Sequence, residues 1–196
     1  MKSRILGLLA VGLLAGPMAA NAAVIINVTE VGGDVVFSTT GSLNLSGATY
    51  LGSTGYNAGF IPGGSNWYIA SGAGGIVDQY ALTSFAGAFG TAGNFFSPPS
   101  SKSGDDFFIW GNLGFTPQVG VASGYISGSA INSFMAFNGA TIAGFTMLLG
   151  TYVYSLPNDT ITLNIGGGGV PVPEPGTLAL LGLGLAGLGL SLRRKA

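Results

Sequence analysis

Short alternations of apolar and polar residues, interrupted by glycines, run through this chain from Val24 to Ile165. No stretch of that region repeats apolar residues at a helical spacing for more than two turns. Serine, threonine, asparagine and aromatic residues fill the positions between the glycines, a composition typical of strands joined by turns. The pattern therefore predicts an all-β domain.

The strand pattern recurs throughout this region. We expect strands at residues 24–31, 34–38, 42–46, 67–70, 80–83, 106–110, 124–129, 131–137, 141–148, 151–155 and 160–165. The pair Gly32-Gly33 favours a tight turn between the first two. The last two form the best predicted hairpin, because residues 161, 163 and 165 are apolar and those between them are polar. The stretch 97–104 is the clearest predicted loop.

These strands predict an antiparallel β-sandwich of about eight to ten strands, with a jelly-roll-like arrangement. A β-solenoid is the main alternative because glycine is so frequent, but the sequence has no fixed repeat period. The chain has 196 residues, so without its terminal segments there is room for one domain of about 150 residues. We place a glycine-rich β-domain at residues 23–169.

Residues 1–22 have the features of a secretory signal peptide, expected as an N-terminal signal helix. Lys2 and Arg4 precede an apolar segment, and Ala20-Asn21-Ala22 fits the preference for small residues at a cleavage site. We expect signal peptidase to cut between Ala22 and Ala23 after export through the Sec pathway. An uncleaved membrane anchor is the alternative.

Residues 170–196 hold three features in a fixed order. Pro173-Glu174-Pro175 comes first, an uncharged apolar run follows, and the basic cluster Arg193-Arg194-Lys195 lies beside the last residue. Prolines lack an N–H donor and restrict the residue before them, so no helix is expected to extend upstream of Gly176. Glu174 is therefore expected in an extended, exposed peptide.

The apolar run would form a helix about 24 Å long, slightly shorter than the hydrocarbon core of a bilayer at about 30 Å. A buried core helix is the alternative, but such a helix normally has a polar face, and this run has none. We expect a transmembrane helix with the basic cluster on the cytoplasmic side. The residues predicted to span the inner membrane are Thr177, Leu178, Ala179, Leu180, Leu181, Gly182, Leu183, Gly184, Leu185, Ala186, Gly187, Leu188, Gly189, Leu190, Ser191 and Leu192.

This order of features closely resembles the PEP-CTERM sorting signal of Gram-negative bacteria. The matching residues are Val172-Pro173-Glu174-Pro175, the leucine- and glycine-rich run, and Arg193-Arg194-Lys195. The resemblance implies recognition and removal of the tail by an exosortase, an integral-membrane cysteine protease. It also implies transient anchoring in the inner membrane, and the family is typical of bacteria that make extracellular polysaccharide.

Segments of the β-domain also resemble a group of PEP-CTERM proteins of unassigned function. The segments are residues 33–36, 41–45, 123–128 and 150–154, together with 160–163. The resemblance implies no catalytic residue.

Charge and composition exclude several classes of function. Between Ala23 and Val170 the only base is Lys102, against six acids, so the side chains of this region carry a net charge of −5. Such a charge disfavours nucleic acid as a partner. The chain contains neither cysteine nor histidine, so a Ser-His-Asp triad, a Cys-His dyad and a histidine-ligated zinc site are impossible. We expect no cofactor.

Asp105 and Asp106 form the only acidic pair in the β-domain. With loop carbonyls they could supply the oxygen ligands that calcium requires, although solvated charges that protect a strand edge are the simpler interpretation. A glycoside hydrolase would need two acids across a cleft, and scattered acids give little support for one. We therefore predict that the protein is not an enzyme.

Trp67, Tyr68 and Trp110 could form an aromatic platform for sugar rings, while burial in the core is the alternative for all three. The sequence as a whole predicts an exported structural or adhesion protein of the cell surface or biofilm matrix, with extracellular polysaccharide as its expected partner. The alternative is a surface module that binds a glycan or calcium, and a polysaccharide hydrolase is the least favoured.

Overall fold

The computed structural model describes residues 23–91 and 95–167. These residues form twelve β-strands arranged in two six-stranded sheets, and they contain no helix. The all-β prediction is therefore confirmed for this part of the chain. The predicted signal helix and transmembrane helix lie outside the described residues. Within those residues, nothing has the helical length and hydrophobicity needed to cross a bilayer.

The first sheet, sheet A, contains the ends of the described chain. Its strands, in spatial order, are β11 (Gly150–Leu156), β12 (Asp159–Ile165), β1 (Ala23–Val31), β2 (Asp34–Ser42), β10 (Ala130–Phe137) and β7 (Ser101–Gly104). The second sheet, sheet B, follows the order β3 (Tyr50–Gly55), β6 (Ile76–Ala81), β9 (Gln118–Ala122), β8 (Phe107–Asn112), β5 (Asn66–Ser71) and β4 (Gly59–Ile61).

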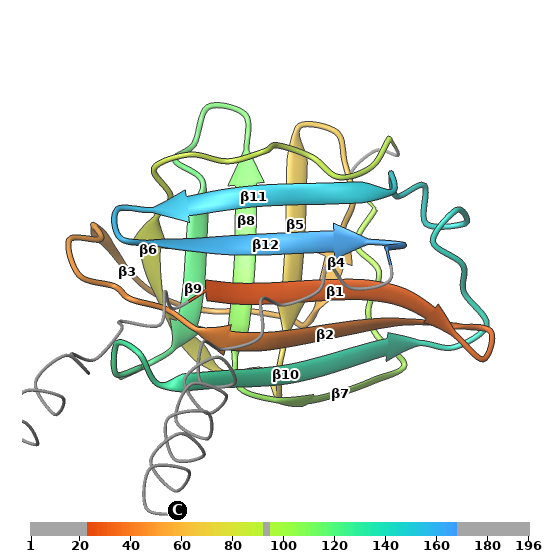
Figure 1. Ribbon diagram of the computed structural model, residues 1–196, viewed down its shortest axis with the longest axis horizontal. Coiled ribbons are helices and arrows are strands. Elements are labelled where there is room, and N and C mark those ends of the chain that lie inside the picture. Colours follow the sequence, from red (N-terminus) through yellow and green to blue (C-terminus); the bar gives the residue numbers. More distant parts are fainter. Residues whose placement is uncertain (1–22, 92–94, 168–196) are drawn as a thin grey trace, which may run out of the picture.

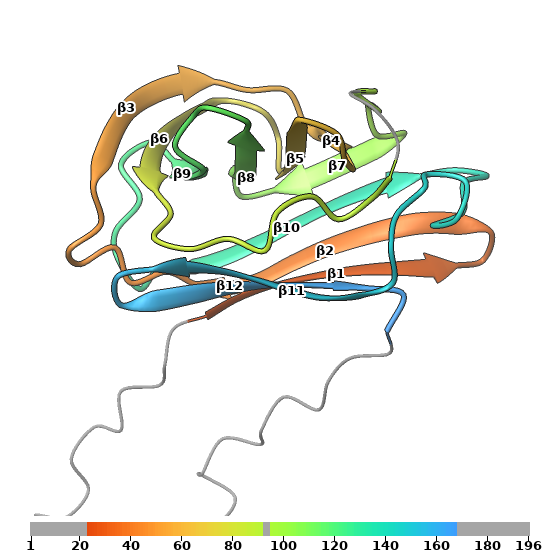
Figure 2. The ribbon, with the colours of Figure 1, turned by 90° about the horizontal axis from the view of Figure 1, so that it is seen from above.

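The two sheets form layers that lie face to face (Figure 2). In Figure 1 the strands of sheet A run across the picture, while β5, β8 and β9 of sheet B run up and down. This is a sandwich-like arrangement in which the strands of the two layers cross rather than align. Sheet B curves strongly, and β3 curls away from sheet A at one side (Figure 2).

One pairing departs from the predicted antiparallel arrangement. The first and last described strands, β1 and β12, are parallel neighbours, with Ala23 opposite Thr160 and Val28 opposite Ile165. Every other strand pairing is antiparallel. Alternation within each strand predicts which side chains are buried, but it cannot predict that two strands far apart in sequence will pair.

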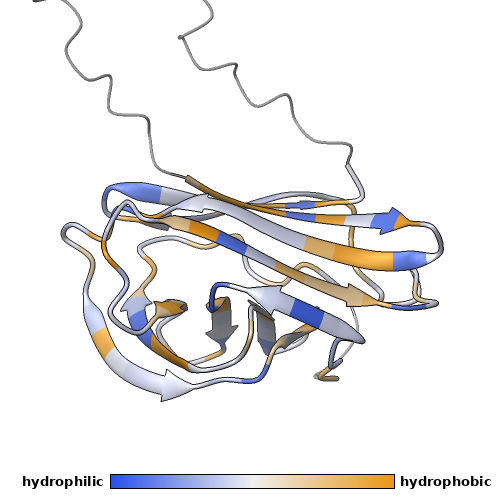
Figure 3. Cartoon of the chain, turned by 90° about the horizontal axis from the view of Figure 1, so that it is seen from below, coloured by the Kyte–Doolittle hydropathy of each residue, from blue (hydrophilic) through white to orange (hydrophobic). Residues whose placement is uncertain are grey.

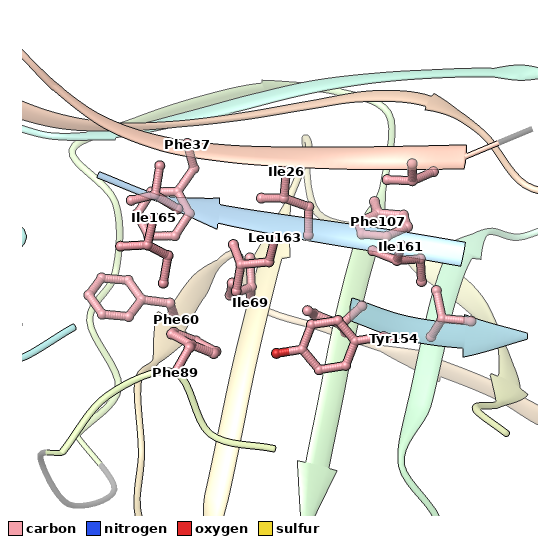
Figure 4. Packing of buried hydrophobic residues seen from close by; sticks show 14 of the residues in the cluster. Ile26, Phe37, Phe60, Ile69, Phe89, Phe107, Tyr154, Ile161, Leu163 and Ile165 are labelled. Carbon is pink, nitrogen blue, oxygen red and sulfur yellow. The ribbon is translucent and has the colours of Figure 1, made fainter. Parts of the chain in front are cut away.

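The core lies between the layers and is built by alternation. In Figure 4, Ile26, Leu163 and Phe37 of sheet A face Ile69 and Phe107 of sheet B, and all five are fully buried. Apolar and hydrophilic segments alternate along the strands (Figure 3). The prediction that residues 161, 163 and 165 share a buried face is confirmed.

The outer face of sheet A includes a cross-strand row of polar side chains. Asn164 donates a hydrogen bond to Asn27 across β12 and β1, at 3.0 Å, and accepts one from Thr151 of β11, also at 3.0 Å. Polar cross-strand pairs of this kind suit a sheet face that borders water.

Three buried hydroxyls connect the layers. Ser71 of sheet B lies 2.6 Å from Ser133 and 3.3 Å from Thr39, measured between hydroxyl oxygens, and these two residues are opposite partners in sheet A. Buried hydroxyls are costly unless they are paired, so this trio favours one relative placement of the two sheets.

The prediction of a strand at 42–46 is wrong beyond Ser42. The backbone N–H groups there donate to side chains instead of a neighbouring strand. Asn44 donates to the Asp159 carboxylate at 2.6 Å, and Leu43 donates to the Tyr125 hydroxyl at 2.9 Å. Leu43 is nevertheless fully buried in the core.

The predicted strands at 124–129 and 141–148 are also wrong. Gly124 and Gly128 have φ values of 79° and 87°, which turn the chain. The second segment makes turn-type bonds, such as the one from the Phe145 N–H to the Thr141 carbonyl at 3.0 Å. The Glu30 carboxylate accepts the N–H of Ile142 at 2.6 Å and holds this turn against β1.

Several strands were not predicted. These are β3, β4, β9 and the edge strand β7, which occupies part of the predicted loop at 97–104. All four residues of β7 are exposed, so that stretch is accessible as predicted, although it pairs with β10.

Candidate functional site

Sheet B carries large apolar residues on both of its faces. Along β5 and β8, Ile69 and Ile109 belong to the main core, whereas Tyr68, Phe108 and Trp110 form a second cluster. Successive side chains of a strand point to opposite sides of the sheet, so this second cluster lies on the outer face. Tyr68 and Trp110 are direct partners across the two strands. The outer face of sheet B is the candidate site.

Small residues beside Phe108 hollow this face. Phe108 is paired with Ala70 on β5 and with Gly120 on β9. A Cβ atom at Gly120 would lie 2.4 Å from the Phe108 ring, so the ring needs a glycine at this position. The groove above has a volume of about 470 Å³, which falls within the range of about 300–1,000 Å³ usual for small-molecule sites.

Five aromatic side chains line the groove, namely Tyr56, Tyr68, Phe96, Phe108 and Trp110. The ring centroid of Tyr68 lies 6.0 Å from that of Phe108 and 6.3 Å from that of Phe96. Phe108 is only 3 % exposed and forms the floor. Tyr68 and Trp110 are half-buried, so parts of their rings face the groove.

Hydrogen bonds hold two of these rings in place. The indole N–H of Trp110 donates to the side-chain oxygen of Asn66 at 2.8 Å. The hydroxyl of Tyr68 donates to the backbone carbonyl of Asn57 at 2.6 Å. Both bonds anchor the polar edge of a ring, so its apolar face remains available for contact.

Amide and hydroxyl groups supply the polar part of the lining. Gln79 of β6 and Gln118 of β9 are joined by an amide–amide hydrogen bond of 2.5 Å. Asn57 and Thr54 also line the groove. An amide side chain carries both donors and acceptors, so these groups can bind hydroxyl groups in either direction.

No charged side chain lines the groove among the described residues. One carboxylate lies behind its wall: the Tyr56 hydroxyl donates to Asp106 at 2.7 Å, and the Gly74 N–H donates to the same oxygen at 2.9 Å. Burial, followed by this hydrogen bond and the charge of Asp106, raises the pKa of Tyr56 above its ordinary value. Burial likewise raises the pKa of Tyr68. Both phenols therefore stay neutral at physiological pH.

Comparison with known families identifies the end of the chain rather than the groove. The family model for the PEP-CTERM protein-sorting motif matches residues 171–195. The chain therefore carries a PEP-CTERM protein-sorting motif. The motif marks an exported protein whose membrane-anchored precursor is processed by an exosortase and which reaches the cell surface. No curated protein and no solved structure matches the chain.

The matched range includes Pro173-Glu174-Pro175, the apolar run and the basic cluster, so the sequence prediction of a sorting signal is confirmed. These residues, like Ala20 and Ala22 before the predicted signal cleavage site, lie outside the described part of the structure. Ala23, on the other side of that site, is the first residue of β1.

The structure separates the three predicted platform residues. Trp67 lies in the core, 5 % exposed, with its ring centroid 5.1 Å from that of Tyr154. Tyr68 and Trp110 lie in the groove. Adjacent residues of a strand face opposite sides, so Trp67 and Tyr68 cannot contribute to the same platform.

Asp105 and Asp106 bind different segments. The carboxylate of Asp105 accepts the N–H of Asn132 at 2.8 Å, while Asp106 binds Tyr56 and Gly74. In the described part of the chain, no three acidic side chains gather as metal ligands would. The calcium alternative therefore gains no support from the positions of Asp105 and Asp106.

Sequence reasoning missed Tyr56, Phe96, Phe108 and the glutamine pair as site residues. One signal was available, because β5 and β8 carry apolar residues at consecutive positions rather than at alternate ones. A strand with that pattern must have two apolar faces. Tyr56 and Phe96 lie in loops, and only the folded chain brings them to the groove.

Proposed function

We propose that the processed protein is a structural or adhesion component of the extracellular matrix that binds polysaccharide in the groove of sheet B. Its sorting motif delivers it to the cell surface, and the resemblance to PEP-CTERM signals implies a bacterium that makes extracellular polysaccharide. The observation that carries the proposal is the open groove with half-buried aromatic rings and amide groups.

The lining suits a sugar chain for two reasons. Aromatic rings offer flat apolar surfaces to the C–H faces of sugar rings, while amides and phenols can bind the hydroxyl groups at their edges. The proposed role is binding without turnover. Glycoside hydrolysis requires two carboxyl groups facing the bond to be cleaved, and none of the described residues lining the groove carries one.

Binding of the secreted, processed protein to purified exopolysaccharide of its host tests the proposal. The unaltered protein should co-sediment strongly with the polysaccharide. Trp110→Ala and Tyr68→Ala should each lower the affinity at least about tenfold. Tyr50→Ala is the matched control, because Tyr50 is an exposed aromatic residue of the edge strand β3, outside the groove. Equal losses in all three variants, or no binding by the unaltered protein to the exopolysaccharide either as purified or with its carboxyl groups reduced, would contradict the proposal.

Processing is tested separately through the tail. The mature chain from wild-type cells should have an intact mass that lacks the apolar run and the basic cluster, while cells without exosortase should retain the full tail in the membrane fraction. A released protein that still carries residues 177–195 would refute removal of the tail.

A further inference from the structure

The charge distribution around the groove narrows the class of polysaccharide. Uncharged aromatic, amide, hydroxyl and aliphatic side chains, together with glycine, make up its described lining. An anionic sugar such as a uronate would have to leave water for this site without a positive partner. Burial of an unpaired charge is among the most costly events in binding.

A nearby carboxylate adds to that cost. Asp106 lies directly behind the wall formed by Tyr56, at 2.7 Å from its hydroxyl. Asp78 precedes Gln79 on β6, so its side chain points to the opposite face of sheet B, where it accepts hydrogen bonds from the Ser53 hydroxyl and the Gly124 N–H. The hydrogen bond from Ser53, followed by that from Gly124, lowers the pKa of Asp78, so this group is negative at physiological pH.

The one base in the described residues lies outside the groove. Lys102 lies on the edge strand β7 of the other sheet and is exposed. Its ammonium nitrogen lies 3.1 Å from the position of a Cβ atom at Gly74, and Lys102 is not among the residues lining the groove. The domain carries a net negative charge, so the electrostatic potential at the groove disfavours an anionic ligand.

Neutral hydrogen-bonding groups are present instead. The Gln79–Gln118 pair crosses from β6 to β9 beside the groove floor. Paired amides are oriented by one another and keep further donors and acceptors for a ligand. Hydroxyl groups of a sugar are both donors and acceptors, which is the chemistry that such a pair matches.

We propose that the groove selects neutral polysaccharide segments and discriminates against sugars that carry carboxylate, sulfate or phosphate groups. This inference rests on the proposed polysaccharide-binding function and adds the substrate class. Because recognition uses no ion pair, binding of the neutral polymer is insensitive to salt, whereas any residual binding of an anionic polymer to an acidic domain varies with salt.

The test uses two forms of one polymer. Host exopolysaccharide is prepared with all carboxyl groups reduced to alcohols, and part of that material is then oxidised at its primary hydroxyls to carboxylates. Affinity of the secreted, processed protein for both forms is measured at low and at high salt. The reduced form should bind at least about tenfold more tightly than the oxidised form, with the same affinity at both salt concentrations.

Two substitutions of Gln118 test whether the preference for the uncharged polymer arises in the groove. Gln118→Lys places a base in the groove and should bring the affinity for the oxidised form up toward that for the reduced form. Gln118→Met, which has a similar length and no charge, should weaken both forms together. Equal or tighter binding of the oxidised form by the unaltered protein would overturn the inference and leave the proposed function standing. Failure of both forms to bind would refute the proposed function as well.

Discussion

Alanine substitutions at Gly104 and Gly114 should have very different effects on stability, although the two glycines have nearly the same φ. The φ of Gly104 is 92°, and a Cβ atom there would lie 2.2 Å from the carbonyl oxygen of Asn132 and 2.8 Å from the Cα of Ser133. Gly114, in the turn after β8, has a nearly equal φ of 87° but nothing within 4 Å of a Cβ atom. The pair separates the cost of backbone conformation from the cost of the close approach.

The expected magnitudes follow from these contacts. An alanine forced into the left-handed region costs about 1–2 kcal/mol, and Gly114→Ala should lose that much free energy of unfolding. Gly104→Ala must in addition displace the Asn132 peptide. The Asn132 carbonyl accepts the Asp105 N–H at 2.9 Å, and the Asn132 N–H donates to the Asp105 carboxylate at 2.8 Å. With about 1 kcal/mol for each bond and about 1–3 kcal/mol for the overlap, the total loss is about 4–7 kcal/mol.

Urea denaturation followed by tryptophan fluorescence and circular dichroism measures both variants. The midpoint of Gly104→Ala should fall far below that of Gly114→Ala, with equal slopes if only the folded state changes. Equal losses in the two variants would refute the close packing of β7 against β10 at Asn132. The segment after Gly104 holds Asp106 and through it Tyr56, so weaker polysaccharide binding should accompany the loss of stability.

Three further predictions address the core and its titration. Trp67→Ala should cost about 3–5 kcal/mol of unfolding free energy because the side chain is buried, and a loss no larger than that of Trp110→Ala would contradict the assignment of the two tryptophans to different faces. Ser71→Ala should cost about 1–3 kcal/mol, because it leaves two buried hydroxyls without a partner. Replacing Ser71, Ser133 and Thr39 together with Ala or Val should lower the unfolding free energy by less than Ser71→Ala alone. A loss equal to the sum of the three single changes would contradict a shared hydrogen-bond network. Burial raises the pKa of Tyr154 above the ordinary value of about 10, so the folded state keeps a proton that the unfolded state releases. The protonated Tyr154 hydroxyl should therefore contribute its full share of the unfolding free energy below about pH 10, and this contribution should decline as the pH rises further. Alkaline denaturation that is unchanged in Tyr154→Phe would contradict this origin.

Local alternation carried much of the fold prediction, because a strand with one buried face reveals itself within a few residues. The hairpin of β11 and β12 is the clearest case, with Ile161, Leu163 and Ile165 buried as expected. The errors occurred where side chains replace a neighbouring strand as hydrogen-bond partners. Asp159 is distant from Asn44 in sequence, and nothing local at 42–46 indicates that its carboxylate will accept that N–H.

The groove was only partly predictable for the same reason. Tyr68 and Trp110 were recognisable as aromatic residues on strands, but their placement opposite each other depends on the register of β5 and β8. The sequence does not show that Gly120 must be a glycine, because that requirement comes from the Phe108 ring, which lies on a different strand. The sorting motif is different, since its order of features is contained in a short continuous stretch of sequence.

The most direct test of polysaccharide binding in the groove uses the fluorescence of Trp110. The chain has two tryptophans, so a Trp67→Phe protein reports from the groove alone. Titration with soluble fragments of the carboxyl-reduced exopolysaccharide should produce a saturable change in emission, and the Tyr68→Ala change in the same protein should weaken it at least about tenfold. Polysaccharide binding that leaves Trp110 emission unchanged and persists in Trp110→Ala would contradict the assignment of the groove as the binding site.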